Sequence, residues 1–355
     1  MTAEAGSLRA AVAGGVDFLL GLQGDDGLWR DFRTPAGAAT SWPSAYAGCA
    51  LRSAGARGTW LDRLSDALER TQHPDGGWGY HEGTPTDADS TSWGVLALAG
   101  RKNVAEVRAR ALACLARHQR PRGGGVATYA EAGPVRRFTG LSRAVPFWGW
   151  RRPHVEIAAV AGRALHGSGS AGARDRAVRA WRFVRSRQQD DGSWPSYWWT
   201  SEHVATEQAV RLAVLMADPE PAARAARWVQ RHQGADGAWR DPAGEGASAF
   251  LTALSVSILA ATGSGDAGLA RGVEALIRLQ DVDGGWPATA ALRIPVPPDR
   301  HPSLDGAWRP VRFGPGLVVP DQERVFTTAT CVAALTGAST TPGRHGPQAR
   351  AVAGP

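Results

Sequence analysis

The run Asp87-Ala88-Asp89-Ser90-Thr91 places two carboxyl groups two residues apart, directly before an apolar helix-forming segment. Neighbouring carboxylates repel each other and burial opposes ionisation, so one of the two can stay protonated near neutral pH. The hydroxyl groups of Ser90 and Thr91, at the start of the helix, are placed to orient such a carboxyl group. The run therefore predicts a general acid, a group that donates a proton to its substrate.

The same residues also suit a purely structural role. An aspartate followed by serine and threonine before an apolar helix commonly caps the helix, because its carboxylate accepts a backbone N–H that has no partner within the helix. In that interpretation Asp89 is an N-cap and has no chemical role. The run alone does not decide between the acid and the cap.

Aromatic residues form a second group with chemical potential. The chain has 15 tryptophans, and only five of them belong to the repeated turn described below. Aromatic faces attract cations without accepting a proton, so we expect about half of the others to line an apolar cavity and the rest to pack between helices. The predicted substrate-contacting residues of this kind are Trp42, Trp93, Phe147, Trp148, Trp150, Trp198, Trp199, Trp308 and Phe326.

A repeated turn positions these residues. The pattern Gln-x-x-Asp-Gly-x-Trp occurs five times, and a sixth, degenerate copy begins at Gln119, with Arg122 in the Asp position and Gly125 in the Trp position. Repeats of this length indicate stacked supersecondary units. The intact copies run over residues 23–29, 72–78, 188–194, 233–239 and 280–286.

Each unit predicts two helices. A segment of helical period leads into the turn, where Asp-Gly ends the helix. A polar loop and a second, alanine-rich helix follow, and no segment shows convincing strand alternation. The expected leading helices include 57–71, 104–118, 175–188 and 222–233. The expected second helices are 44–53, 90–99, 156–165, 205–215, 248–260 and 326–335.

Six helical hairpins predict an all-α fold of two concentric rings, with the alanine-rich helices inside. An open solenoid is the alternative, but it normally carries polar capping repeats, and none is evident. Two longer segments, after Gln119 and at 292–320, are expected to cover one end of the rings. We expect one domain over residues 1–337 and a disordered tail over 338–355, which is rich in Thr, Pro, Gly and Ala.

Composition narrows the function further. The sequence has 355 residues and a net charge of +7, carried by arginine because Lys102 is its only lysine. No basic block is interleaved with stacking aromatics, which disfavours nucleic-acid binding. No signal peptide or membrane span is indicated, so we expect a cytoplasmic protein. The three cysteines form no visible disulfide or zinc pattern.

The five intact turns resemble the QW motifs of the squalene–hopene cyclase and oxidosqualene cyclase family. The resemblance covers the chain from about Gly6 to Gly337. It implies one α/α6 barrel, the toroid that class II terpene cyclases share with protein prenyltransferases. Full-length relatives have two or three domains, whereas we expect one in this chain. The motif is more specific for the fold than for the activity.

The resemblance also implies a reaction. The hopene-type Asp-x-Asp-Asp-Thr motif corresponds to residues 87–91, with Ser90 in place of its last aspartate. The family's proton donor then maps onto Asp89, and we expect Asp87 and Ser90 to tune it. The implied activity is proton-initiated cyclisation of a linear isoprenoid, or of the prenyl chain of a meroterpenoid, at an alkene or epoxide. The alternatives are a barrel that binds an apolar ligand without turnover and a cyclase of a non-terpene polyene.

Further polar residues are expected near the same cavity. Asp321 precedes the sixth second-type helix as Asp89 precedes the second, and there it could stabilise a cation or accept the terminal proton. Its structural alternative is a helix-start acid paired with Arg324. His154 and His203, each with a nearby glutamate, could orient the acid or deprotonate a cation, although a solvated or structural role is the favoured interpretation for each.

Several metal and cofactor motifs are absent from the sequence. It contains no Asp-Asp-x-x-Asp magnesium motif, no evident zinc set around its cysteines and no Cys-Gly-Glu-Gln thioester. We therefore expect no metal and no cofactor. The expected partner is a hydrophobic isoprenoid or meroterpenoid, whose delivery is compatible with peripheral membrane contact.

Overall fold

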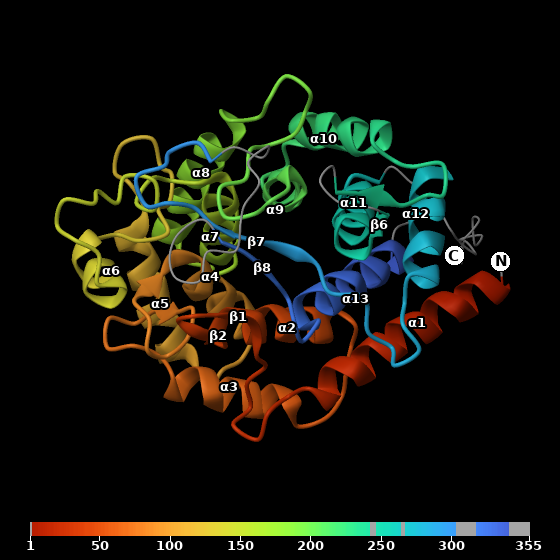
Figure 1. The fold of residues 1–355 in the computed structure, drawn as a ribbon, viewed down its shortest axis with the longest axis horizontal. Helices are drawn as coiled ribbons and strands as arrows, with labels where there is room; N and C mark the ends of the chain where they lie inside the picture. Colours follow the sequence, from red (N-terminus) through yellow and green to blue (C-terminus); the bar gives the residue numbers. More distant parts are fainter. Residues whose placement is uncertain (1, 242–245, 264–266, 303–316, 341–355) are drawn as a thin grey trace, which may run out of the picture.

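Helices make up most of the computed structural model, which describes residues 2–241, 246–263, 267–302 and 317–340 (Figure 1). Alanine, leucine and arginine, all good helix formers, dominate these segments. The helices in the described ranges are α1 (Thr2–Gly21), α2 (Ser41–Ser53), α3 (Trp60–Arg70), α4 (Ala88–Ala97), α5 (Ala105–His118), α6 (Ala132–Thr139), α7 (Val155–His166), α8 (Ala171–Arg185), α9 (Glu202–Leu215), α10 (Pro219–Arg231), α11 (Ala249–Ala261), α12 (Ala267–Arg278) and α13 (Val325–Thr340).

Both series of helices expected from the repeat are confirmed. The segments that lead into a turn are α3, α5, α8 and α10, and the six that follow a turn are α2, α4, α7, α9, α11 and α13. Helices α1 and α12 complete the leading series, and the short α6 lies in the segment after Gln119. The predicted ends differ from the observed ends by a few residues, as is usual for frayed helix termini.

The structure also contains short strands that the sequence did not predict. Four two-stranded antiparallel sheets lie in the described ranges, and each lies between an intact turn and the following helix. Strands of two to five residues are too short for alternation to be detected. The pairs are β1 (Asp31–Thr34) with β2 (Gly37–Ala39), β3 (Trp78–Gly79) with β4 (Thr86–Asp87), β5 (Trp239–Arg240) with β6 (Ala247–Ser248), and β7 (Ala290–Ile294) with β8 (Leu317–Pro320).

The glutamine of each turn joins its own unit to the next one. In the last unit, the Gln280 side-chain amide donates to the carbonyl of Gly284 at 2.8 Å and to that of Ala11, in α1, at 2.9 Å. The last unit is thus bonded to the first. In the other units, in chain order, the acceptor in the next leading helix is the carbonyl of Trp60, Val107, Arg176, Pro221 or Gly268.

The tryptophan of each intact turn fixes the two helices of its own unit. The Trp286 indole N–H donates to the carbonyl of Leu276 in α12 at 2.8 Å, and its backbone N–H donates to the Thr328 hydroxyl in α13 at 3.2 Å. The other four intact turns make the same pair of bonds, with Ser44, Thr91, Thr206 and Thr252 as the hydroxyl partners. A fully buried indole with a satisfied N–H contributes a large apolar surface without a desolvation penalty.

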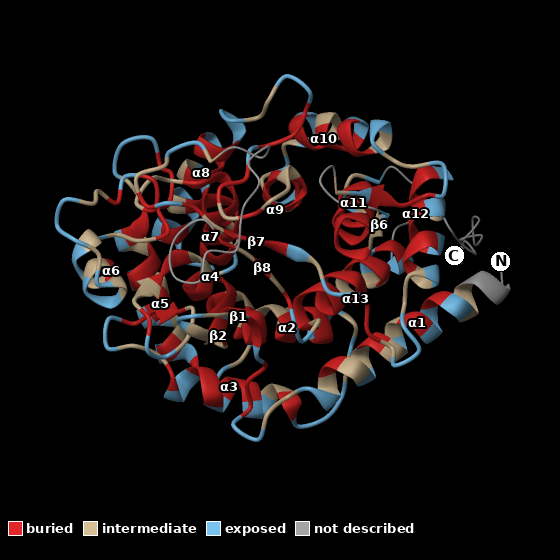
Figure 2. Cartoon of the chain, in the orientation of Figure 1, coloured by how far each residue is buried: buried red, intermediate tan, exposed pale blue. Residues whose placement is uncertain are grey.

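The six alanine-rich helices contact one another in a closed order. Helix α2 packs on α4, α4 on α7, α7 on α9, α9 on α11, α11 on α13, and α13 on α2. In Figure 1 these helices occupy the middle of the view, with α1, α3, α5, α8, α10 and α12 around them. Small residues permit this close approach, and Figure 2 shows that the inner helices are largely buried.

The inner helices run parallel. Between α2 and α13, Trp42 meets Phe326 near the N-termini, and one turn further on the Tyr46 hydroxyl bonds that of Thr330. Between α2 and α4, Arg52 near the C-terminus of α2 donates to the carbonyl of Ala97 at the C-terminus of α4. The N-terminal turns of these helices therefore face one end of the molecule.

The two longer segments pack together, as expected for segments that share one end. The Trp150 indole N–H donates to the carbonyl of Pro295 at 2.8 Å, and the Gly149 N–H donates to that of Pro297 at 2.8 Å. Trp199 pairs with Leu292 as an isolated bridge. These contacts join three segments that are far apart in the sequence.

Helix α13 continues to Thr340, so the predicted domain boundary at residue 337 falls inside it. Residues 338–340, whose composition predicts a disordered tail, thus belong to the last turn of a helix. Residues 341–355 of the predicted tail lie outside the described residues. None of the described helices is long and apolar enough to cross a membrane.

The bond that joins the last unit to the first can be tested by stability. Gln280→Ala leaves two carbonyls without their donor and should lower the free energy of unfolding by about 1–3 kcal/mol. Gln280→Glu, which keeps the shape but replaces the donor with an acceptor, should destabilise at least as much. Exposed Glu274 on α12 provides the control, since Glu274→Ala should change stability by less than about 0.5 kcal/mol. If urea unfolding gives the Gln280 variants the same free energy of unfolding as the wild-type protein, the bond contributes nothing to stability.

Candidate active site

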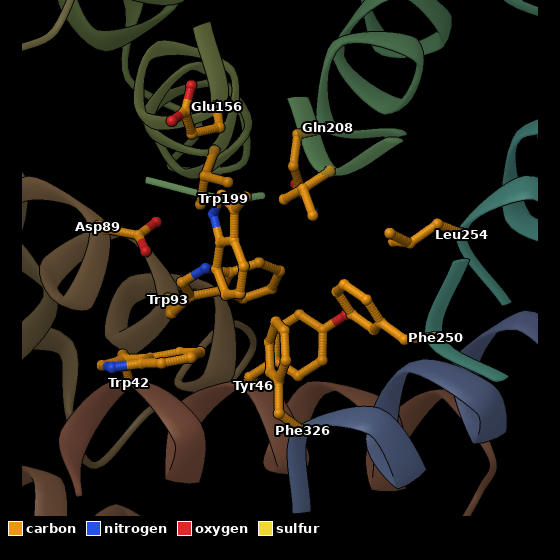
Figure 3. A pocket seen from close by; sticks show the side chains of 12 residues that line it. Trp42, Tyr46, Asp89, Trp93, Glu156, Trp199, Gln208, Phe250, Leu254 and Phe326 are labelled. Atoms are coloured by element: carbon orange, nitrogen blue, oxygen red, sulfur yellow. The ribbon is translucent and has the colours of Figure 1, made fainter. Parts of the chain in front are cut away.

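A pocket lies among the N-terminal halves of the inner helices (Figure 3). It contains about 340 Å³ of empty space, part of which is open to solvent. Six of its lining residues are aromatic, four are aliphatic or amide side chains, and two are acids. The lining residues are Trp42, Tyr46, Asp89, Trp93, Glu156, Val160, Trp199, Val204, Gln208, Phe250, Leu254 and Phe326.

These residues form two layers, because the inner helices are parallel and side chains four residues apart share a helix face. Each of α2, α4, α7, α9 and α11 contributes one residue to each layer. The upper layer contains Trp42, Asp89, Glu156, Val204, Phe250 and Phe326. The lower layer, one turn further along, contains Tyr46, Trp93, Val160, Gln208 and Leu254.

The Asp89 carboxyl group lies among the aromatic side chains of the pocket. Figure 3 shows its carboxyl group pointing toward the side chains of Trp93 and Trp199. Burial raises the pKa of Asp89 well above its ordinary value, and the nearby carboxylates of Asp87 and Glu156 raise it further. These effects favour the protonated form of Asp89 at neutral pH, as the general-acid interpretation requires.

The helix cap is Asp87, not Asp89. The Asp87 carboxylate accepts the backbone N–H of Ser90 at 2.7 Å and its hydroxyl at 2.8 Å. Ser90 therefore orients Asp87 and does not bond the predicted acid. Thr91 likewise bonds the carbonyl of Asp87, at 2.6 Å. Burial raises the pKa of Asp87 to about 6, less than it raises that of Asp89, because the Ser90 bonds favour its ionised form.

Glu156, on the first turn of α7, is the second carboxyl group of the pocket. Its Oε1 accepts the backbone N–H groups of Tyr197 at 2.8 Å and Trp198 at 2.9 Å. Its Oε2 is buried and has no hydrogen-bond partner among the described residues. Burial raises the pKa of Glu156, against the effect of those two N–H donors.

Aromatic rings close the pocket on the side of α2 and α13. Trp199 stacks on Phe326 with ring centroids 5.1 Å apart and planes 12° from parallel. Trp42 meets Phe326 edge to face at 5.0 Å, and Tyr46 meets Trp93 edge to face at 4.6 Å. Such offset and edge-to-face contacts fix the rings and leave some faces directed at the cavity.

The structure brings together only part of the predicted set. Asp89, Trp42, Trp93, Trp199 and Phe326 line the pocket. Asp87 and Ser90 lie next to Asp89 on α4, as the cap and its partner. Trp308 lies outside the described residues. The remaining predicted residues do not line it: Asp321, Phe147, Trp148, Trp150, His154, Trp198 and His203.

Asp321 is a correction to the sequence analysis. Its carboxylate is fully buried and accepts the backbone N–H groups of Thr289 at 2.5 Å and Thr327 at 2.8 Å. It therefore ties the β7–β8 sheet to the start of α13 and does not face the cavity. Nor does it pair with Arg324, which bonds Asp281 and Asp283. Burial raises the pKa of Asp321 to about 6.

Neither predicted histidine reaches the pocket. His154 stacks on Tyr197 at 3.7 Å and bonds the carbonyl of Gly149 at 2.9 Å. His203 bonds the Ser201 hydroxyl at 2.8 Å and packs on Trp228. Burial lowers the pKa of each histidine to about 3, so both are neutral at physiological pH. These contacts are those of core histidines.

Four of the predicted aromatic residues lie outside the pocket: Phe147, Trp148 and Trp150 in the longer segment after Gln119, and Trp198 in the loop before α9. Phe147, Trp150 and Trp198 pack in a separate cluster with Tyr197, beside the pocket. Trp148 is 58% exposed, so it points away from the interior. Aromatic composition identified these segments but not the direction of each ring.

Several lining residues were missed from the sequence, among them Tyr46, Gln208 and Phe250. Glu156 was noted only as a neighbour of His154. The signal that could have found them is helical spacing: Tyr46 lies four residues after Trp42, and Phe250 lies two residues into its helix, as Phe326 does. Among the described residues, no group of three or more His, Cys, Asp or Glu side chains could hold a metal ion.

A family model described as the squalene-hopene cyclase C-terminal domain matches residues 151–293. Drimenyl diphosphate synthase of Streptantibioticus cattleyicolor is 38% identical over 103 residues. That stretch is 29% of this chain and 19% of the synthase, so the match spans less than a fifth of that relative.

Solved structures match over nearly the full length. The type II terpene cyclase MstE from Scytonema, in its apo form, gives a TM-score of 0.85 at 28% identity, covering 94% of this chain and 99% of that one. A variant of MstE in complex with its substrate, geranylgeranyl dihydroxybenzoate, gives 0.85 at 27% identity, covering 96% and 99%. A protein from Actinoplanes gives 0.82 at 31% identity, covering 94% and 100%.

The electrostatic coupling between the two aspartates gives a test that needs no substrate. Asp87→Asn retains an acceptor for the Ser90 N–H but removes the negative charge, so the pKa of Asp89 should fall. A carboxyl ¹³C NMR titration can follow it, with Asp89→Asn used to assign the signal. Glu82→Gln, which removes an exposed carboxylate close in sequence, should leave that pKa unchanged. An unchanged Asp89 titration in Asp87→Asn would contradict the coupling.

Proposed function

We propose that the chain is a type II terpene cyclase that cyclises the prenyl chain of a meroterpenoid by proton transfer from Asp89, as its similarity to MstE suggests. The observation that carries this proposal is the position of Asp89: a half-buried carboxyl group, on the first turn of an inner helix, in a pocket walled by aromatic rings. Geranylgeranyl dihydroxybenzoate, the substrate of MstE, is the first compound to test.

The reaction begins with a proton. The Asp89 hydroxyl transfers its proton to one carbon of the terminal alkene, or to the epoxide oxygen, and leaves a carbocation and the Asp89 carboxylate. An alkene is a very weak base, so the acid must be both neutral and poorly solvated before transfer. Burial and the negative charges near Asp89 provide those conditions, and Asp87 remains in place as the helix cap.

The aromatic walls carry the reaction forward. Ring closure moves the positive charge from one carbon of the chain to the next, and a water molecule or a basic side chain would end the sequence early. The faces of Trp42, Trp93, Trp199 and Phe326 stabilise a cation electrostatically without capturing it. A pocket of fixed rings also holds the chain in one folded shape, which lowers the entropy lost at each closure.

The last step returns the proton. Loss of a proton from the final cation makes the overall reaction an isomerisation, and the Glu156 carboxylate is the other acid–base group that lines the pocket. Its Oε2 has no protein partner among the described residues and can accept that proton. Because Glu156 and Asp89 interact electrostatically, proton exchange between them would restore the starting state.

The proposed architecture is a single-domain α/α6 barrel. The closed order of contacts among the six inner helices supports it, and so does the bond from Gln280 back to Ala11. The contacts between the two longer segments near Trp150 support the idea that they cover the N-terminal end of the barrel. We place the whole of this domain within residues 1–340.

Replacing the acid is the most direct test. Asp89→Asn should reduce kcat by about 10²- to 10⁴-fold or more, because an amide cannot supply the proton. Turnover by the wild-type protein should persist in EDTA, since the carboxyl group is the source of the electrophile. Glu82→Gln is the control and should retain activity. Cyclic products are identified by mass spectrometry and NMR with geranylgeranyl dihydroxybenzoate; turnover that is indifferent to Asp89 would contradict the proposal.

The pH dependence follows from the direction of the Asp89 pKa shift. Asp89 reacts when it is protonated, so kcat should be high at pH values below its raised pKa and should decrease as the pH rises through it. Asp87→Asn lowers that pKa, so its decrease should begin at a lower pH. Single-turnover rates from about pH 5 to about pH 9 would test this; a rate that rises with pH would show that a base, not an acid, limits the reaction.

A further inference from the structure

Four polar side chains form a network at the lower layer of the pocket and directly below it; Glu207 and Gln208 are buried, and Arg163 and Arg211 are half-buried. The Arg163 guanidinium donates to the Gln208 side-chain carbonyl, and the Gln208 amide donates to Glu207 Oε2 at 2.8 Å. Arg211 forms an ion pair with the other oxygen of Glu207. The network therefore runs from α7 through two neighbouring residues of α9, and the proposed reaction uses none of its charges.

The network is continuous with the pocket at two points. Gln208 itself lines the pocket. Arg163 lies over the ring of Trp93, another lining residue, with its guanidinium carbon 5.5 Å from the ring centroid. The charged groups begin where the aromatic and aliphatic lining ends, on the side of the inner-helix C-termini.

The neighbouring helices leave room for these side chains. One turn beyond the lower layer, α2, α4 and α7 carry Ala50, Ala97 and Ala164 on the faces that hold Tyr46, Trp93 and Val160. Alanine fills little of the space between inner helices. The long side chains of Arg163 and Arg211 lie at the same level, beside the buried Leu212 and Ile258, and both are close enough to Tyr46 to interact with it electrostatically. We therefore expect their truncation to deepen the cavity by up to roughly one helical turn, about 5 Å.

Stability does not explain why charged residues occupy this level. Burial lowers the pKa of Arg163 to about 10, which reflects the desolvation of its charge. Well-packed apolar residues in place of buried ion pairs are often equally stable or more so. A network of hydrogen-bonded arginines does provide a rigid surface that an apolar chain cannot enter without breaking those bonds and leaving charges unpaired.

We propose that the Arg163–Gln208–Glu207–Arg211 network is the floor of the pocket and sets the length of the prenyl chain that the protein cyclises. This inference rests on the proposed function. The folded chain must fit between the floor and the rings of Trp199 and Phe326, so a chain one isoprene unit longer is excluded by the space that the network fills. The network thus limits chain length in two ways. It fills the space, and its polar surface disfavours apolar groups at that level.

The test compares substrates that differ only in chain length: farnesyl, geranylgeranyl and geranylfarnesyl dihydroxybenzoate. Two kcat/KM values are compared: that for the substrate one isoprene unit longer than the wild-type protein prefers, and that for the preferred substrate. Arg163→Ala and Gln208→Ala should each raise the ratio of the first to the second by about tenfold or more. Arg52→Ala is the matched control. That exposed arginine bonds carbonyls at the same end of the inner helices but lies outside the network, so the length preference should not change.

The outcomes separate the two proposals. Suppose that the wild-type protein converts one chain length and that folded Arg163→Ala or Gln208→Ala keeps the same length preference. The proposal that the network sets chain length would then be wrong, and the proposed cyclase function would stand. If no chain length is converted by the wild-type protein, the proposed function itself fails. Thermal unfolding identifies a variant that has not folded, and Gln208→Ala, which leaves the Arg211–Glu207 pair intact, then carries the test.

Discussion

A carboxyl group that must stay protonated inside an apolar pocket is the constraint on which the rest of the site depends. Any backbone N–H or guanidinium that reached Asp89 would favour its ionised form. The helix start would ordinarily supply such donors, but the Asp87 carboxylate accepts them instead, and Ser90 completes that bond. The cap of α4 therefore has a second effect: it leaves the neighbouring acid without a backbone donor and adds a negative charge beside it.

The repeated turns hold the inner helices in place, so the residues that line the pocket do not have to stabilise the fold. Each glutamine and each intact-turn tryptophan bonds backbone carbonyls of the leading helices, which lie outside the inner helices. Because these bonds hold the inner helices in parallel, their inward faces are free to carry aromatic rings, an acid or a polar network. Stability is thus supplied by the outer contacts and function by the inner layers, and the two sets of residues hardly overlap.

This separation explains what the sequence could predict. The turns have a fixed spacing and strong local chemistry, so the helices and the position of Asp89 follow from them. The inward faces depend on helix rotation, which alanine-rich segments do not reveal because they are apolar on every side. Tyr46 and Gln208 were missed for that reason. Asp321 was misplaced because an acid at a helix start can bond backbone N–H groups as readily as it can face a cavity.

The degenerate third unit, which begins at Gln119, departs from the repeat in a part of the chain that contributes to the pocket. Gln119 keeps both of its bonds, to the carbonyls of Gly124 and Arg176, so the junction between units survives. The tryptophan does not: a side chain at Gly125 would collide with the ring of Phe183, which lies 2.6 Å from the position of a Cβ. This unit alone carries α6, and its inner helix α7 carries both Glu156 and Arg163. Departures from a repeat are expected where residues serve function rather than the fold. The degenerate turn therefore indicates, from the sequence, that α7 is, after α4, the inner helix whose residues matter most for function.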